Sequence, residues 1–273
     1  MTLTDFRTPW AKSEPFLVKN NKVSESLWSP NEFLKIAAHN VPTIYDCESR
    51  KKCKVTTPEL FLGKFKNYVA RPINPKKIAD WPANESFRTV FPDQYANFMD
   101  NLAFSEYTHP NGVFNLVSYL PKFLCNIPDL GPKLYIADGS LDSGITSTHL
   151  HKDMSDAINT CKWVEFPING EHVTEQALRD EYLVCQAQID RFNKNKEKLA
   201  AVWHIFKANH YDKINRYLLG KNRGTIHDQS AYLTHKDFKE FRIEQVRPYT
   251  ILQFEGDTIH LPAGLPHQVM KFC

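Results

Sequence analysis

The tripeptide His151-Lys152-Asp153 places an imidazole and a carboxylate two residues apart. In a β-strand, residues i and i+2 point to the same face, so these two side chains would converge while Lys152 points away. His267 follows the proline- and glycine-rich turn 262–266 and is placed to supply a third ligand. Two histidines and one carboxylate leave positions of an octahedral ion open, the arrangement typical of non-haem Fe(II) oxygenases. Those positions accept a bidentate 2-oxo acid and then dioxygen.

The spacing alone does not establish a metal site or identify the metal. A histidine in a strand is more often a hydrogen-bonded core residue than a ligand. His149-Leu150-His151 also offers two imidazoles on one face, and such a pair suits copper or zinc. The residues themselves therefore leave three alternatives open: an iron site, a copper or zinc site, and ordinary core histidines.

The composition describes an ordinary globular chain. With 273 residues, of which 42% are hydrophobic and 12% aromatic, it can bury a sizeable core. A formal net charge of +3 is too weak to predict nucleic-acid binding. The scattered cysteines have neither zinc-knuckle nor disulfide-framework spacing, which favours a reducing compartment. Residues 1–10 lack the apolar core of a signal peptide, and no apolar run approaches the roughly 20 residues that span a bilayer, so we expect a soluble intracellular protein.

The first half of the chain reads as helix-rich. Residues 1–26 are charged and irregular, and we expect them to form a loose N-terminal arm. Helix-start signals follow, each with a proline at the first helical position, at Pro30, Pro58 and Pro92. We therefore expect these helices to form a shell.

The second half mixes strands and helices. The expected strands cover 134–136, 148–164 (a pair or one long strand), 249–254, 258–261 and 268–272. The expected helices cover 173–192 and 211–219, and a third helix is capped by Thr234 with Asp237. Strands at both ends with helices between them predict an α+β fold with a mostly β core. We expect one domain over 27–273, a double-stranded β-helix (jelly-roll, cupin-like) barrel with a helical N-terminal shell and helical insertions.

Longer strings are more specific than the tripeptide. They include Leu27-Trp28-Ser29-Pro30, Asn115-Leu116, His151 through Asn159, Ile226-His227-Asp228-Gln229-Ser230, and Pro262-Ala263-Gly264-Leu265-Pro266-His267-Gln268-Val269. Their order and spacing run from about residue 27 to the end of the chain. In these strings the chain resembles the JmjC domain of histone lysine demethylases, and specifically the branch that acts on lysine 9 of histone H3 and includes the hairless protein.

The resemblance implies a register for the metal site. His151, Asp153 and His267 match the iron ligands of the family, which makes His149 a neighbour and not a ligand. Because the relatives continue beyond the residues after His267, we also expect this domain to be truncated at its C-terminus.

The resemblance also implies contacts with 2-oxoglutarate. Thr148 matches a threonine that hydrogen-bonds the cosubstrate carboxylate in many JmjC proteins, and Asn159 matches an asparagine near it. Tyr135 is placed like a tyrosine that lines the pocket. A lysine further along the strand of Asn159 meets the distal carboxylate in many relatives. Here Lys162 has the opposite strand parity to Asn159, so no residue is assigned to that role.

The activity implied is that of an Fe(II)- and 2-oxoglutarate-dependent dioxygenase that demethylates N-methyl-lysine. Hydroxylation of the methyl group releases formaldehyde and turns 2-oxoglutarate into succinate. The implied substrate is a histone tail, most specifically mono- or dimethylated lysine 9 of histone H3, and the implied location is the nucleus. Two alternatives stay open: a catalytically silent JmjC-like domain that binds chromatin, and a hydroxylase of protein side chains.

Overall fold

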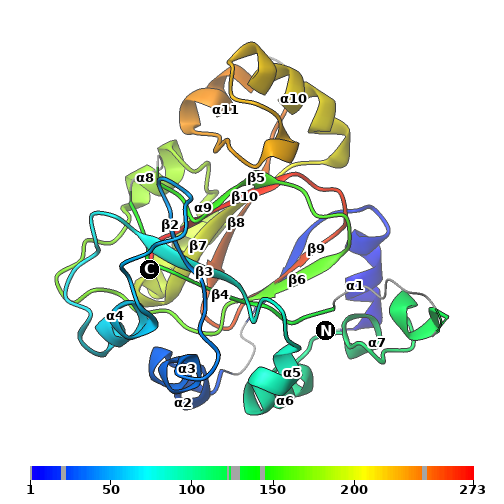
Figure 1. The fold of residues 1–273 in the computed structure, drawn as a ribbon. Helices are drawn as coiled ribbons and strands as arrows, with labels where there is room; N and C mark the ends of the chain where they lie inside the picture. Colours follow the sequence, from blue (N-terminus) through cyan, green and yellow to red (C-terminus); the bar gives the residue numbers. More distant parts are fainter. Residues whose placement is uncertain (1, 20–22, 122, 124–129, 142–144, 242–244) are drawn as a thin grey trace.

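The computed structural model describes residues 2–19, 23–121, 123, 130–141, 145–241 and 245–273 (Figure 1). In these ranges the strands lie in the middle of the molecule and short helices surround them, with α10 and α11 grouped at one end. The architecture is therefore mixed α+β. Over the same residues, no helix has the length and apolar character needed to cross a membrane.

The bounds of the elements are as follows. The α-helices are α1 (Leu3–Trp10), α2 (Glu25–Trp28), α3 (Pro30–Ala37), α4 (Pro58–Gly63), α5 (Phe87–Val90), α6 (Pro92–Asp100), α7 (Ser105–Thr108), α8 (Glu175–Asp180), α9 (Gln186–Lys194), α10 (Tyr211–Gly220) and α11 (His235–Phe241). The strands are β1 (Phe16–Val18), β2 (Ile44–Asp46), β3 (Lys76–Trp81), β4 (Leu134–Ala137), β5 (Thr148–His151), β6 (Ala157–Thr160), β7 (Leu199–Ile205), β8 (Tyr249–Phe254), β9 (Thr258–Leu261) and β10 (His267–Lys271).

A four-stranded sheet in the order β5-β10-β7-β8 carries the residues with metal-binding chemistry. All its pairings are antiparallel, and His267 on β10 lies opposite His151 on β5 and opposite Ile205 on β7. Residues of β7 are buried along the whole strand. The middle of the sheet is therefore buried in the core, while β5 brings His151 to the edge of the sheet.

A second sheet has the order β1-β9-β6 and takes in the N-terminal segment. Phe16 pairs with His260, and α1 packs Phe6 against the same region at 2% exposure. Residues 1–26 were expected to form a loose arm, but residues 3–18 instead form α1 and β1, which pack against β9. The segment is held because its apolar side chains find partners on β9, more than 200 residues further along the chain.

The chain alternates between these two sheets, since β5 and β10 belong to one and β6 and β9 to the other. This alternation is the connectivity that a jelly roll requires. The strands of the described ranges nevertheless form separate sheets and not a closed barrel, and the third sheet has the order β2-β3-β4. The α+β class is confirmed, while closure of a barrel is not seen.

Most of the expected elements are present with shifted ends. Helices begin at Pro30, Pro58 and Pro92 as predicted. The helix expected over 173–192 is two helices, α8 and α9, because the backbone turns at Leu183, whose φ is +59°. Strand β7 was not predicted. Its apolar run is buried on both faces, so it lacks the alternation that marks a half-buried strand.

Candidate metal centre

The pairing of β5 with β10 sets the backbone of the centre. His151 ends β5 and His267 begins β10 directly opposite it. Asp153 follows β5, and its carbonyl accepts a hydrogen bond of 2.9 Å from the Gly264 N–H in the turn before β10. A second bond, of 2.8 Å, joins the Ala263 N–H to the Asp156 carboxylate. These bonds fix the 262–266 turn against the segment that carries Asp153.

The three side chains converge. One ligand atom from each of His151, Asp153 and His267 lies within 4.8 Å of the others. The Asp153 carboxylate stands 3.9 Å from His151 Nε2 and 3.8 Å from His267 Nε2. The two imidazole centroids are 4.2 Å apart. This is the only group of three or more such ligands in the described part of the chain, and His149 is outside it.

Backbone carbonyls fix which ring nitrogen faces the centre. His151 Nδ1 lies 2.8 Å from the His149 carbonyl, and His267 Nδ1 lies 2.9 Å from the Leu265 carbonyl. A carbonyl only accepts, so each Nδ1 carries the proton and each Nε2 keeps its lone pair for a metal. This outer hydrogen bond is the usual way in which proteins orient a ligating histidine.

Burial and charge also suit a divalent ion. Burial, with a smaller effect from the neighbouring His151, lowers the pKa of His267 to about 4, so its imidazole is neutral and able to ligate. The His267 side chain is 4% exposed, whereas that of Asp153 is 43% exposed. The centre therefore has a dry inner side and an open outer side. Two imidazoles and one carboxylate form a donor set that Fe(II), Mn(II) and related ions accept.

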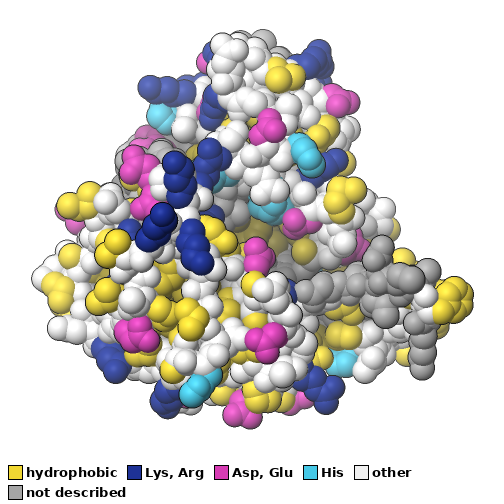
Figure 2. Space-filling model, in the orientation of Figure 1, with side chains coloured by type: hydrophobic (Ala, Val, Ile, Leu, Met, Phe, Trp, Pro, Cys, Tyr) yellow, Lys and Arg dark blue, Asp and Glu magenta, His cyan; other side chains and the backbone are white. Residues whose placement is uncertain are grey.

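A cavity of about 530 Å³ opens beside this group, and His151 and Asp153 line it. Its volume is in the range of small-molecule sites. Figure 2 shows Lys and Arg side chains gathered on this face beside a recess in which a histidine is visible. The cavity lining includes Arg50, Lys77, Asp80, Tyr135, Ser147, Thr148, His149, His151, Asp153 and Lys271.

Two of the residues expected to contact 2-oxoglutarate line this cavity, Thr148 and Tyr135. Thr148 lies opposite Val269, two residues beyond His267 on β10. The Tyr135 hydroxyl donates a hydrogen bond to Asp80, and burial raises the pKa of this phenol above its ordinary value. Tyr135 is therefore a neutral donor that already has an acceptor.

Asn159 is not among the residues that line the cavity. It lies on β6 in the other sheet, and its side-chain carbonyl accepts a bond of 3.1 Å from Gln253 Nε2. Gln253 in turn accepts a bond of 2.8 Å from Trp203 Nε1. The Trp203 ring stacks on His267, with centroids 5.8 Å apart and an angle of 19° between the planes. Asn159 is thus connected to His267 through two intermediate side chains, those of Gln253 and Trp203.

Three cationic residues of the cavity were not anticipated from the sequence: Arg50, Lys77 and Lys271. Lys271 shares strand parity with His267, and this parity was the available signal. Arg50 and Lys77 come from the β2-β3 region, whose packing beside β5 no local pattern reveals.

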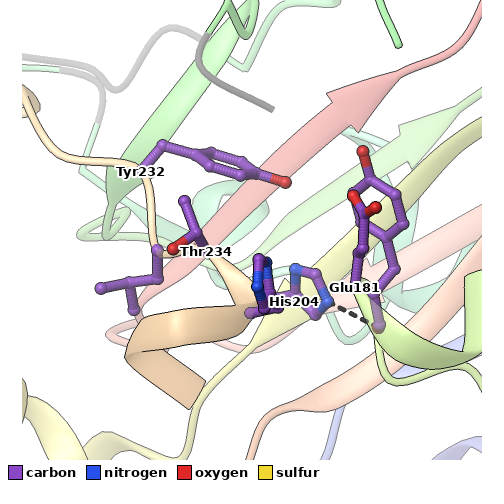
Figure 3. A pocket seen from close by; sticks show the side chains of 7 residues that line it. Glu181, His204, Tyr232 and Thr234 are labelled. Atoms are coloured by element: carbon purple, nitrogen blue, oxygen red, sulfur yellow. Dashed lines mark hydrogen bonds between the residues drawn. The ribbon is translucent and has the colours of Figure 1, made fainter. Parts of the chain in front are cut away.

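A second cavity is unrelated to the metal centre (Figure 3). It measures about 10 Å³, room for about one water molecule, and Glu181, His204, Tyr232 and Thr234 line it. His204 Nε2 bonds the Tyr182 carbonyl at 2.8 Å, and His204 Nδ1 lies 3.4 Å from Gln268 Nε2. Both ring nitrogens of His204 are therefore occupied, as expected for a structural histidine.

Comparison with known proteins identifies the family. A model described as "JmjC domain, hydroxylase" matches residues 193–273. Lysine-specific demethylase 3A of Homo sapiens is 33% identical over 287 residues, which cover 97% of this chain and 22% of that protein. Lysine-specific demethylase JMJ29 of Arabidopsis thaliana is 29% identical over 331 residues, which cover 99% of this chain and 37% of that protein.

The chain thus spans about a fifth to two fifths of the length of these curated relatives. The similarity extends well beyond the residues matched by the family model. The chain contains a JmjC domain and is homologous, over nearly its whole length, to lysine-specific demethylase 3A.

Proposed function

We propose that this protein is an Fe(II)- and 2-oxoglutarate-dependent oxygenase that removes methyl groups from N-methyl-lysine in a histone tail. The observation that carries the proposal is the convergence of His151, Asp153 and His267 in a chain homologous to lysine-specific demethylases. Two of the three, His151 and Asp153, line the cavity of about 530 Å³. The convergence depends on the β5–β10 pairing and on two carbonyl-bonded imidazoles, so it is built into the backbone.

Each ligand has a distinct task. Nε2 of His151 and of His267 would hold the ion, and the Asp153 carboxylate would offset part of its charge. When bound, Fe(II) with 2-oxoglutarate and dioxygen supplies the oxidising power for hydroxylation of a methyl group. The protein's own part is to hold these ligands in place. It also keeps one side of the centre dry, where Trp203 covers the His267 ring.

The cosubstrate would lie in the cavity beside the ligands. We assign Thr148 to a hydrogen bond with a 2-oxoglutarate carboxylate and Tyr135 to the wall, since both line the cavity. A direct contact from Asn159 stays a prediction. Its carboxamide bonds Gln253 here, so such a contact requires the carboxamide to leave that partner.

We further propose that residues 27–273 belong to one JmjC-like domain built on a double-stranded β-helix, to which the N-terminal segment adds β1 by pairing with β9. The alternation of β5, β6, β9 and β10 between two sheets supports this barrel. The proposed substrate is mono- or dimethylated lysine 9 of histone H3, which would place the protein in the nucleus. Both rest on the homology with lysine-specific demethylases.

The test is a turnover assay on the purified chain with Fe(II), ascorbate, 2-oxoglutarate and a dimethyl-lysine histone H3 peptide. We expect succinate and formaldehyde in equal amounts, and neither from Asp153→Ala. Succinate with a hydroxylated peptide and without formaldehyde would favour a side-chain hydroxylase. Absence of iron by elemental analysis, together with no consumption of 2-oxoglutarate, would favour a silent chromatin-binding domain.

A further inference from the structure

The cavity beside the metal ligands carries more positive than negative charge. Its lining contains the cations Arg50, Lys77 and Lys271, and the carboxylates Asp80 and Asp153. Asp153 belongs to the metal centre, and a divalent ion there would add further positive charge. Lys77 and Lys271 are half-buried, whereas Arg50 is exposed, and a cation withdrawn from water is costly unless an anion accompanies it. The lining therefore predicts an anionic ligand.

Of the three cavity cations, Lys271 is the one whose ammonium group has no ion-pair or hydrogen-bond partner in the described part of the chain. Arg50 donates to the Gln229 carbonyl at 3.3 Å, and Lys77 donates to the Ser147 carbonyl. For the Lys271 ammonium, the residues within the described ranges provide neither an ion pair nor a hydrogen bond. Its electrostatic neighbours are cysteine thiols and Lys77, and burial lowers its pKa. The nearby Asp138 carboxylate is already paired with Lys64 and with the Lys76 N–H.

The strand geometry aligns Lys271 with the metal ligand. Every second side chain of a strand points to the same face, so His267, Val269 and Lys271 share one face of β10. Lys271 thus lies about 13 Å along the strand from His267, and it lines the same cavity as His151 and Asp153. Thr148 sits opposite Val269, between the two ends. A linear dicarboxylate bound at the metal by one end would pass Thr148 and reach Lys271 with the other.

Lys162 does not compete for this role. Its ammonium lies 5.2 Å from the Trp28 ring centroid and 5.4 Å from that of Phe98, and it is not part of the cavity lining. The strand of Asn159 and the residues directly after it thus bring no lysine to the cavity, within the described ranges.

We propose that the Lys271 ammonium binds the distal carboxylate of 2-oxoglutarate, so that β10 supplies both a metal ligand and the cation for the far end of the cosubstrate. This inference rests on the proposed function and deepens it. It assigns the cosubstrate an orientation along the β5–β10 pair, with its 2-oxo acid end at His267 and its second carboxylate at Lys271.

The test measures binding without turnover, using the full chain loaded with Mn(II). Calorimetric titrations compare 2-oxoglutarate with 2-oxobutanoate, which keeps the 2-oxo acid end and lacks the distal carboxylate. A charge-assisted hydrogen bond corresponds to about a 10- to 100-fold change in affinity. We expect Lys271→Met and Lys271→Gln to weaken the binding of 2-oxoglutarate by that factor. The affinities for 2-oxobutanoate and for Mn(II) should stay within about twofold of the wild-type values. Lys271→Arg should retain most of the affinity.

Lys162→Met is the matched control, because it removes a half-buried lysine outside the cavity. It should change neither titration. The inference is overturned if the Lys271 variants bind 2-oxoglutarate like the wild type, or if they lose both acids equally. Failure of the wild type to bind 2-oxoglutarate in the presence of Mn(II) is a different result, which removes the proposed function and the inference with it.

Discussion

Two buried histidines on consecutive strands, His260 on β9 and His267 on β10, have opposite chemistry. His267 has its Nδ1 bonded to the Leu265 carbonyl and its Nε2 turned towards Asp153. His260 is 1% exposed, and neither of its ring nitrogens has a partner in the described part of the molecule. Its ring stacks on Phe16 at 4.6 Å, with Phe6 and Phe104 at 5.9 and 5.8 Å.

The difference shows that burial of a histidine does not by itself indicate a site. For both residues burial lowers the imidazole pKa to about 4. Only His267 combines that burial with an outer hydrogen bond to Nδ1 and a converging carboxylate. We call the surroundings of His260 the aromatic box, formed by Phe6, Phe16 and Phe104, and expect it to contribute stability and no chemistry.

The largest expected effect is on metal binding. His267→Ala removes one of the three ligands and should abolish measurable Mn(II) binding, because loss of even an outer partner commonly costs 10- to 100-fold in metal affinity. His260→Phe should keep the Mn(II) affinity within about twofold. Calorimetric titration measures both, with circular dichroism to verify the fold. Equal losses in the two variants would contradict the contrast between the histidines.

The next effect separates stability from chemistry at the aromatic box. Phe6 contacts Trp10, Phe16, Phe104 and Tyr107 with ring centroids 4.4–5.6 Å apart. Phe6→Ala should lower the free energy of unfolding by about 3–5 kcal/mol in urea titrations and leave the Mn(II) affinity unchanged. Phe123→Ala is the control, because Phe123 is 84% exposed and its loss should cost little. A small change for Phe6→Ala would mean that the N-terminal segment adds little to the fold.

The same two regions show what the sequence could predict. The C-terminal strands were predicted because Gly256-Asp257 and the 262–266 turn delimit them, and the His151–Asp153 parity follows from strand geometry. Convergence with His267 depends on a pairing between segments more than 100 residues apart, which no local pattern encodes. The turn before His267 made it a candidate, and the family resemblance selected it. The packing of α1 and β1 was missed for the same reason, since their partner β9 is remote in sequence.

The third prediction concerns pH. Burial lowers the His260 pKa from 6.5 to about 4, so as pH falls the unfolded chain takes up this proton before the folded chain does. His260 therefore lowers the free energy of unfolding progressively as the pH falls from about 6.5 to about 4, and it has no such effect above pH 6.5. Relative to the wild type, His260→Phe should gain about 2 kcal/mol of unfolding free energy on going from pH 8 to pH 5.

Urea titrations at the two pH values measure this gain, and subtraction of the wild type cancels the contributions of the other histidines. His39→Phe is the control, because His39 is exposed. A gain for His260→Phe that is the same at both pH values would show that His260 is not held neutral by burial.

The smallest effect tests whether the metal centre depends on the side chains behind it. Gln253 accepts from Trp203 Nε1 at 2.8 Å and donates to Asn159, and Trp203 covers the His267 ring. Gln253→Leu leaves the buried Trp203 N–H without its acceptor. The Trp203 ring should then shift, and His267 should be positioned less firmly by the stacking contact between the two rings. We expect a Mn(II) affinity about tenfold weaker, the low end for outer partners.

Gln188→Leu is the matched control for Gln253→Leu. Gln188 also clamps β8, with bonds to the Thr250 carbonyl at 2.7 Å and the Leu252 N–H at 2.6 Å, but it has no bond to Trp203. Its loss should reduce stability and leave the Mn(II) affinity unchanged. If both variants weaken Mn(II) equally, the effect comes from a general loosening of β8, and the Asn159–Gln253–Trp203 chain does not position His267. If only Gln253→Leu weakens Mn(II) binding, the buried hydrogen bonds of Gln253 influence the metal centre through the Trp203 ring. Such an environment differs from those of both His260 and His267, because its polar groups act on the metal indirectly.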